Sequence, residues 1–398
     1  MSNSDNQGPL AGIRVLDLGA YIAAPYGCAL LADQGAEVIK IEPPGGDNFR
    51  QYPSTLEGEN RAFLGVNRGK RGISLDLKHE RGMEIFRALV RRSDVLVHNF
   101  RPSVPPRLGM DYESMKALNP GLIYCSVTGY GENGPLKDHA GYDQVLQAMT
   151  GMCAMQGMDK GRPEILYGSV VDYYAAALLA AGVASALYER SRTGMGQQIG
   201  VSLMRSALAM QSARLVWADG EPREVNRDMR SGGVTGIHPT REGYIYISAN
   251  TPHFWNALCD KAGLPPAARS ERYDTVKKRN EHAQEVLAML HEALSRRSAM
   301  EWEAIFGTQV PCACVRTVED MFDHPQVRAE GMLTEMNHAK VGAYRAVHQP
   351  IKFGRQAHRA PGLPAPAFGQ HTRDILSELG LTDSQIESYL NSGALCAD

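Results

Sequence analysis

The stretch Ile13–Ile41, IRVLDLGAYIAAPYGCALLADQGAEVIKI, decides the fold. Ile13–Leu18 (IRVLDL) and Glu37–Ile41 (EVIKI) are short apolar runs of the kind found in buried strands. Between them, Pro25 suits the first turn of a helix, where its missing N–H is not needed, and Gly35 suits the end of one. The stretch therefore predicts a strand–helix–strand unit with two parallel strands.

The same alternation continues beyond this unit. Ile73–Leu77 and Asp94–His98 (DVLVH) are strand-like, and His79–Arg92 between them has the pattern of an amphipathic helix. Leu122–Val127 (LIYCSV) predicts a further strand. Alternating strands and helices predict an α/β fold, with a mainly parallel, Rossmann-like sheet and helices on both faces.

The first turn argues against a nicotinamide cofactor. Dinucleotide sites need the spacing G-x-G-x-x-G, so that the backbone can approach a pyrophosphate. Gly19–Ala24 reads GAYIAA and lacks that spacing.

Domain boundaries follow a change in composition. The polar stretch Asp219–Arg230 (DGEPREVNRDMR) predicts a linker. We expect a large domain over residues 1–225, a smaller α+β domain over 226–325 and a separate tail over 326–398. The smaller domain should contain a strand at Tyr244–Ser248 and helices near residues 254–262 and 280–295.

Composition excludes several classes of function. The 398 residues carry 42 Lys and Arg against 44 Asp and Glu, a net charge of −2, which argues against a nucleic-acid partner or an anionic membrane surface. The 7 cysteines show no disulfide pattern, and the polar N-terminus has no export signal, so we expect a cytoplasmic protein. Cys312 and Cys314 lack partner ligands at metal-site spacing, so no metal is predicted.

Asp172 has two interpretations. It precedes an apolar, alanine-rich segment, so its side chain could cap that helix. A carboxylate at a helix N-terminus beside apolar groups would also stay ionised but poorly hydrated, which makes it a usable nucleophile toward an activated acyl group.

Other candidates lie in loops. Gly129–Pro135 (GYGENGP) is either a loop that binds a ligand or a plain surface turn. Ser231–Gly236 (SGGVTG) is either a flexible linker or a loop that lies over the reacting centre and donates N–H groups to an oxyanion. A basic and polar set could hold a polyphosphate or could be solvated surface groups. This set consists of Lys78, Asn99, Arg107 and Lys137.

A series of motifs runs in order along nearly the whole chain. They are Gly8–Asp17, Gly35–Gly45, Asn67–Arg71, Leu75–Lys78, Asn99–Pro102, Gly129–Gly131, Gly141–Asp143, Val171–Tyr173, Arg192–Gln197, Gly369–Thr372 and Leu376–Leu381. In these motifs the sequence resembles the class III coenzyme A transferases, the family of formyl-CoA transferase and the carnitine-pathway CoA transferase.

The resemblance implies both architecture and activity. It implies a large Rossmann-like CoA-binding domain, a small domain, a tail that returns to the large domain, and two chains threaded into an interlocked homodimer. It also implies CoA transfer from an acyl-CoA donor to a carboxylic acid through aspartyl anhydride and aspartyl-CoA thioester intermediates, with no permanently bound cofactor.

The resemblance further assigns site residues. Asp172 is the implied catalytic carboxylate, and Tyr142 falls near the acyl end of the CoA site. Gly232 and Gly233 resemble the family's mobile glycine loop. The family's CoA contacts fall on Leu75, Lys78, Asn99, Phe100 and Arg107.

Departures from the family leave alternatives open. Ile22 replaces an active-site glutamine and Pro43 replaces an arginine near the adenine, which makes formate or oxalate chemistry doubtful. The related α-methylacyl-CoA racemases should carry a histidine where Tyr142 stands, and tyrosine is a poor base at neutral pH. A racemase and a non-catalytic CoA-binding homologue remain the alternatives to a transferase.

Overall fold

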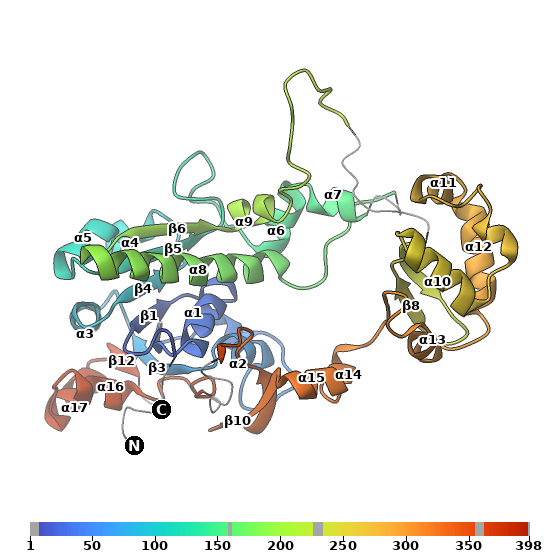
Figure 1. Ribbon diagram of the computed structural model, residues 1–398. Coiled ribbons are helices and arrows are strands. Elements are labelled where there is room, and N and C mark those ends of the chain that lie inside the picture. Colours follow the sequence, from blue (N-terminus) through green and yellow to red (C-terminus); the bar gives the residue numbers. More distant parts are fainter. Residues whose placement is uncertain (1–7, 158–160, 226–233, 355–361, 397–398) are drawn as a thin grey trace. The chain divides into compact units, whose positions relative to one another are not determined.

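The computed structural model describes residues 8–157, 161–225, 234–354 and 362–396 (Figure 1). The chain divides into two compact units. Unit 1 contains the chain up to Val216 and again from Glu330 onward, and unit 2 contains Trp217–Ala329.

Unit 1 is built on a seven-stranded sheet in the described part of the chain. Its strands lie in the order β12-β3-β2-β1-β4-β5-β6, which is that of a doubly wound sheet extended by one strand. All neighbouring strands are parallel except β12, which runs antiparallel to β3. The strands are β1 (Arg14–Leu18), β2 (Glu37–Glu42), β3 (Lys70–Leu75), β4 (Val95–His98), β5 (Ile123–Thr128), β6 (Gln198–Ser202) and β12 (Leu395–Cys396).

The first strand–helix–strand unit is confirmed. β1 is followed by helix α1 (Ala23–Asp33) and then by β2, which pairs parallel to β1. Gly35 ends the connection with φ +103°, a conformation that side chains rarely adopt. The chain is therefore a mixed α/β protein with a central, mostly parallel sheet, as the sequence predicts.

Helices cover both faces of this sheet (Figure 1). On one face, α1 and α8 (Val170–Thr193) bury Leu31 and Leu179 against strand residues such as Val97. The tail of the chain packs on the other face, beside the helices that follow β3 and β4. The helices that follow these strands are α3 (Glu80–Arg91) and α5 (Tyr112–Leu118). The helices of the tail are α16 (Thr372–Glu378) and α17 (Asp383–Asn391).

Helix α8 is long and apolar enough to cross a membrane, by length and composition alone. A core helix of a soluble protein passes the same test. Ala175, Leu179 and Val183 of α8 are fully buried within unit 1. Less than half of its apolar window is buried, so the packing of unit 1 accounts for part of its apolar composition.

Smaller elements complete unit 1. The hairpin of β10 (Leu333–His338) and β11 (Gly342–Val347) is antiparallel. The remaining elements are η1 (Asn48–Gln51), α2 (Arg61–Val66), α4 (Val104–Leu108), α6 (Asp143–Met149), α7 (Met152–Gln156) and α9 (Leu203–Ala209).

Unit 2 has its own core, in which Trp255, Leu290 and Phe306 are buried. The helix expected near residues 280–295 is α12 (Ala283–Leu294), which begins three residues later than expected because the chain leaves helical geometry at His282. The strands are β7 (Gly236–Pro239), β8 (Tyr244–Ile247) and β9 (Cys312–Cys314). The helices along this segment are α10 (Pro252–Ala262), η3 (Pro266–Arg269), α11 (Val276–Glu281), α12 (Ala283–Leu294), α13 (Ala299–Phe306), α14 (Val318–Met321) and α15 (Pro325–Glu330).

Candidate active site

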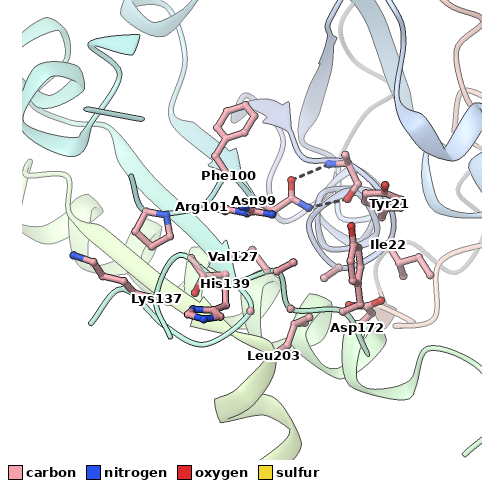
Figure 2. Close-up of a pocket in the computed structure, with 18 residues that line it drawn as sticks. Tyr21, Ile22, Asn99, Phe100, Arg101, Val127, Lys137, His139, Asp172 and Leu203 are labelled. Atoms are coloured by element: carbon pink, nitrogen blue, oxygen red, sulfur yellow. Dashed lines mark hydrogen bonds between the residues drawn. The ribbon is translucent and has the colours of Figure 1, made fainter. Parts of the chain in front are cut away.

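A pocket of about 270 Å³ lies at the carboxyl ends of β1, β4 and β5 (Figure 2). β1 and β4 are adjacent in the sheet, and the strand order reverses between them, which is where open α/β sheets bind ligands. The lining comes from the loops after these strands and from three helices. It comprises residues 20–23, 99–102, 127–129, 137, 139–142, 172 and 203.

Asp172 lies in the first turn of α8 and lines the pocket. Its side chain does not cap the helix, so the capping interpretation is wrong. Its carboxylate makes no hydrogen bond to another residue within the described ranges. The group is therefore free to meet a ligand.

Asp143 takes the capping role instead. Its Oδ2 accepts the backbone N–H groups of Val171 at 2.7 Å and Asp172 at 3.0 Å. Asp143 is 2% exposed, and Gln147 donates to its other oxygen. The N–H groups beside Asp172 are consequently occupied, so they cannot serve as oxyanion donors in this arrangement, contrary to the simplest expectation for a helix N-terminus.

The position beside Asp143 also changes the acidity of Asp172. Burial of the carboxylate, with the negative charge of Asp143 as a second cause, raises the pKa of Asp172 to about 7. The sequence argument predicts a carboxylate kept ionised by the helix. In the structure, desolvation outweighs that effect, and the group titrates near neutral pH.

Asn99 and Phe100 also line the pocket, from the loop after β4. The amide of Asn99 forms two hydrogen bonds with the backbone of Ala20: its Oδ1 accepts the N–H at 3.0 Å and its Nδ2 donates to the carbonyl at 2.8 Å (Figure 2). Asn99 thereby ties the β4 loop to the β1 loop across the switch point.

The other sequence-predicted residues are distributed unevenly. Tyr142 lines the pocket, whereas Leu75 is 1% exposed in the core and pairs with Leu395 of β12. Lys78 and Arg107 lie outside the lining. Gly232 and Gly233 lie outside the described residues.

The lining carries more positive than negative side chains. Lys137, from the basic set, lies at the end opposite Asp172, and Arg101 contributes a second cation (Figure 2). No group of three His, Cys, Asp or Glu side chains in the described ranges is placed to hold a metal ion. The pocket therefore suits an anionic ligand that reaches toward a single carboxylate.

Sequence reasoning missed several lining residues. Tyr21, Arg101, His139 and Leu203 all face the pocket. Tyr21 and Arg101 each lie three positions after the end of a predicted strand, so their position at the carboxyl edge of the sheet was the available signal. His139 and Leu203 depend on how later loops fold back, which no local pattern indicates.

Comparisons with known proteins show what the chain as a whole is similar to. A family model described as CoA-transferase family III matches residues 10–372. A succinate–glutarate CoA-transferase of Agrobacterium fabrum is 33% identical and covers 93% of this chain and 96% of its own length. An acetyl-CoA:oxalate CoA-transferase of Acetobacter aceti is 36% identical, covering 90% of this chain and 93% of its own. The crystal structure of a CAIB/BAIF family protein from Brucella suis superposes with a TM-score of 0.82 at 31% identity, covering 94% of this chain and 99% of that one.

Proposed function

This chain belongs to CoA-transferase family III, and we propose that it moves CoA from an acyl-CoA donor to a free carboxylic acid through covalent intermediates on Asp172. The observation that supports this mechanism most directly is the Asp172 carboxylate itself. It lines a pocket with cationic groups and makes no hydrogen bond to any residue in the described ranges.

The first half-reaction forms and exchanges an acyl-enzyme. A carboxylate oxygen of Asp172 attacks the thioester carbonyl of the donor, the C–S bond breaks, and CoA leaves as a thiolate. The product on the enzyme is a mixed anhydride. The thiolate then attacks the aspartyl carbonyl and expels the donor acid as a carboxylate, which leaves an aspartyl-CoA thioester.

The second half-reaction reverses this order with a new acid. The acceptor carboxylate attacks the aspartyl thioester and expels CoA thiolate, which gives a second anhydride. The thiolate attacks the acceptor's carbonyl, so acyl-CoA forms and Asp172 regains its ionised carboxylate. No net proton or electron is exchanged.

Each tetrahedral intermediate needs hydrogen-bond donors for its oxyanion, worth roughly 3–4 kcal/mol for one good donor. The N–H groups of Val171 and Asp172 already donate to Asp143. We assign the role to the first turn of α1, because Ile22 and Ala23 line the pocket and first-turn N–H groups have no acceptor within a helix.

We propose that CoA follows the positive lining. Phe100 and Asn99 would contact the pantetheine arm and Tyr142 the acyl end. Lys78 and Arg107 would hold the phosphates beyond the pocket, with Leu75 beneath the nucleotide. Water must be kept from the reacting carbonyl, because it would otherwise hydrolyse the anhydride. No other cofactor is needed.

The names of the relatives suggest the acids. The Agrobacterium protein is a succinate–glutarate CoA-transferase and the Acetobacter protein an acetyl-CoA:oxalate CoA-transferase. We propose short dicarboxylic acids such as succinate and glutarate as donors and acceptors for this chain, because Ile22 in place of the family's active-site glutamine argues against oxalate.

Racemisation is not favoured by the site. A racemase needs a base on each face of the α-carbon. Interaction with Tyr21 raises the pKa of Tyr142 further above its ordinary value, so this phenol stays protonated at neutral pH. Tyr142 therefore cannot supply the second base.

A donor–acceptor panel tests the function. The purified protein is incubated with each acyl-CoA and each acid, and new acyl-CoA products are followed by mass spectrometry. Asp172→Ala should abolish transfer, and hydroxylamine should trap an acyl group on the wild type only. Full transfer by Asp172→Ala would refute the role of Asp172. Deuterium exchange at the α-carbon without an acceptor would instead support a racemase.

We also propose that the protein acts in the cytoplasm as an interlocked homodimer. Large apolar side chains are exposed on unit 1, among them Tyr173, Tyr188 and Val216, and a second copy would cover them. The mass of the particle in solution, measured at several concentrations, tests the dimer; a monomer at all of them would contradict it.

A further inference from the structure

Tyr21 has an unusual backbone conformation. Its φ is +66°, and within the described ranges it shares a positive φ with only one other non-glycine residue, Gln349. For a residue with a bulky side chain this conformation costs on the order of 1 kcal/mol or more, so the surroundings must hold it in place. Such positions often mark functional sites.

The side chains of Asp47 and Asn99 hold the backbone of Ala20 and Tyr21 in place. Asp47 Oδ1 accepts the N–H of Tyr21 at 3.3 Å, and Asn99 binds both backbone groups of Ala20. Asp47 is itself fixed by the ammonium of Lys40 at 3.0 Å, in an ion pair that is almost completely buried. The loop is therefore built to present Tyr21 in one orientation.

The ring of Tyr21 is supported on several sides. Phe49 and Tyr52 lie behind it, each with its ring centroid 6.1 Å away. Tyr142 packs edge-on at 5.8 Å, and the pocket lining contains both Tyr21 and Tyr142. These two rings form an aromatic wall in the same small pocket as Asp172.

The polar end of this wall has one donor to offer. The hydroxyl of Tyr21 accepts from the Asn48 amide at 3.4 Å and also shares a hydrogen bond with the hydroxyl of Tyr142, so the pair has one proton left for a ligand. Tyr142 is about half exposed, with 52% of its surface accessible. The lining holds a single carboxylate, Asp172, against two cations. An acyl tail that carries a second carboxylate is therefore favoured over an uncharged tail.

We infer that Tyr21 is a specificity-determining residue, whose ring limits the length of the acyl tail and whose hydroxyl, hydrogen-bonded to that of Tyr142, donates to a carboxylate at the far end of the tail. The site would then take short dicarboxylic acyl groups and discriminate against monocarboxylic groups of the same length. This inference rests on the proposed function, since it concerns the acyl group that Asp172 would carry.

The test separates ring size from hydroxyl chemistry. kcat/KM is measured for pairs of acceptors with equal carbon number, succinate against butyrate and glutarate against pentanoate, and then for longer dicarboxylates, with one fixed donor. Tyr21→Phe keeps the ring, so it should lower kcat/KM for dicarboxylates about tenfold or more and leave monocarboxylates nearly unchanged. Tyr21→Ala removes the ring and should shift the preferred length toward longer acids. Tyr244→Phe, at an exposed tyrosine of β8 in unit 2, is the matched control.

The outcomes are distinguishable. If the wild type transfers CoA and the acceptor ratios are equal in wild type, Tyr21→Phe and Tyr21→Ala, the inference is overturned and the proposed function stands. A wild-type preference for monocarboxylates overturns the inference and the proposed dicarboxylic acids, but leaves CoA transfer through Asp172 standing. If the wild type transfers CoA to no acid in the panel, the proposed function fails and the inference fails with it. Tyr21→Phe alone decides the result if Tyr21→Ala does not fold, as judged by circular dichroism.

Discussion

The carboxylate of Asp143 accepts the backbone N–H of Asp172 at 3.0 Å, so two carboxylates lie together at the start of α8. Asp143 is buried and caps the helix by accepting its N–H groups, whereas Asp172 faces the pocket. The buried carboxylate orients the first turn of the helix, and its charge makes ionisation of Asp172 less favourable.

Activity should depend on pH through Asp172. The nucleophile is the ionised form, and its pKa is raised to about 7, so kcat/KM should rise with pH over an acid limb centred near 7. Asp143→Asn removes the neighbouring charge and should move this limb to lower pH by about one unit or less. A pH–rate profile of both proteins measures the shift, with KM for the donor as the control for intact binding. An acid limb at the same pH in both proteins would contradict the coupling.

The same ionisation should affect stability. The pKa of Asp172 is higher in the folded than in the unfolded chain, so the folded state binds the extra proton, and its stability falls as pH rises from about 4 to about 7. Asp172→Asn has no such group and should be more stable than wild type at pH 8, by up to about 4 kcal/mol, with little difference at pH 4. Denaturant unfolding at the two pH values gives this difference. The same difference at both pH values would show that ionisation of Asp172 is not its cause.

The sequence predicts the sheet well where the strands are apolar and pair with strands that lie close to them in the sequence. β1, α1 and β2 lie where IRVLDL and EVIKI place them. The strand expected at Ile73–Leu77 instead begins at Lys70, because Lys70 is buried as the partner of Asp17 and a charged residue does not look like a strand residue. β12 is missed because its two residues pair with a strand more than 300 positions away.

The candidate site is less visible in the sequence. The residues that the resemblance assigns to CoA include Asn99 and Phe100, and both line the pocket. The positive φ of Tyr21 is imposed by Asp47 and Asn99 through contacts between distant segments, so no property of tyrosine indicates it. The capping of α8 by Asp143 is likewise a contact between the first turns of two helices, made by residues 28 and 29 positions apart.

Asp17 should be essential for stability. It is fully buried, accepts the ammonium of Lys70 at 2.7 Å and caps the turn after β1 through the N–H of Gly19. Asp17→Ala would leave Lys70 buried without its counter-charge and should lower the free energy of unfolding by about 3–5 kcal/mol.

Glu387→Gln provides the matched control for this ion pair. Glu387 pairs with Arg373 at 2.7 Å, but both side chains are 53% exposed, so its loss should change stability by less than about 1 kcal/mol. Equal effects of the two substitutions in denaturant unfolding would mean that burial does not decide the strength of these pairs.

Gly129 and Gly141 allow two loops of the pocket to approach each other. A β-carbon added at Gly129 would lie 2.8 Å from the Cα of Gly141, closer than real side chains come to backbone. Gly129→Ala should therefore separate the β5 loop from the Gly141–Tyr142 segment, lower stability by about 1–3 kcal/mol and reduce kcat/KM more than this loss of stability explains. Gly65→Ala is the control, because Gly65 lies in α2 with no atom within 4 Å of the added carbon. That variant should be neutral or up to about 1 kcal/mol more stable, as alanine is the better helix former. Transfer assays and unfolding curves on both variants test the approach, and a fully active, stable Gly129→Ala would show that the two loops need not touch.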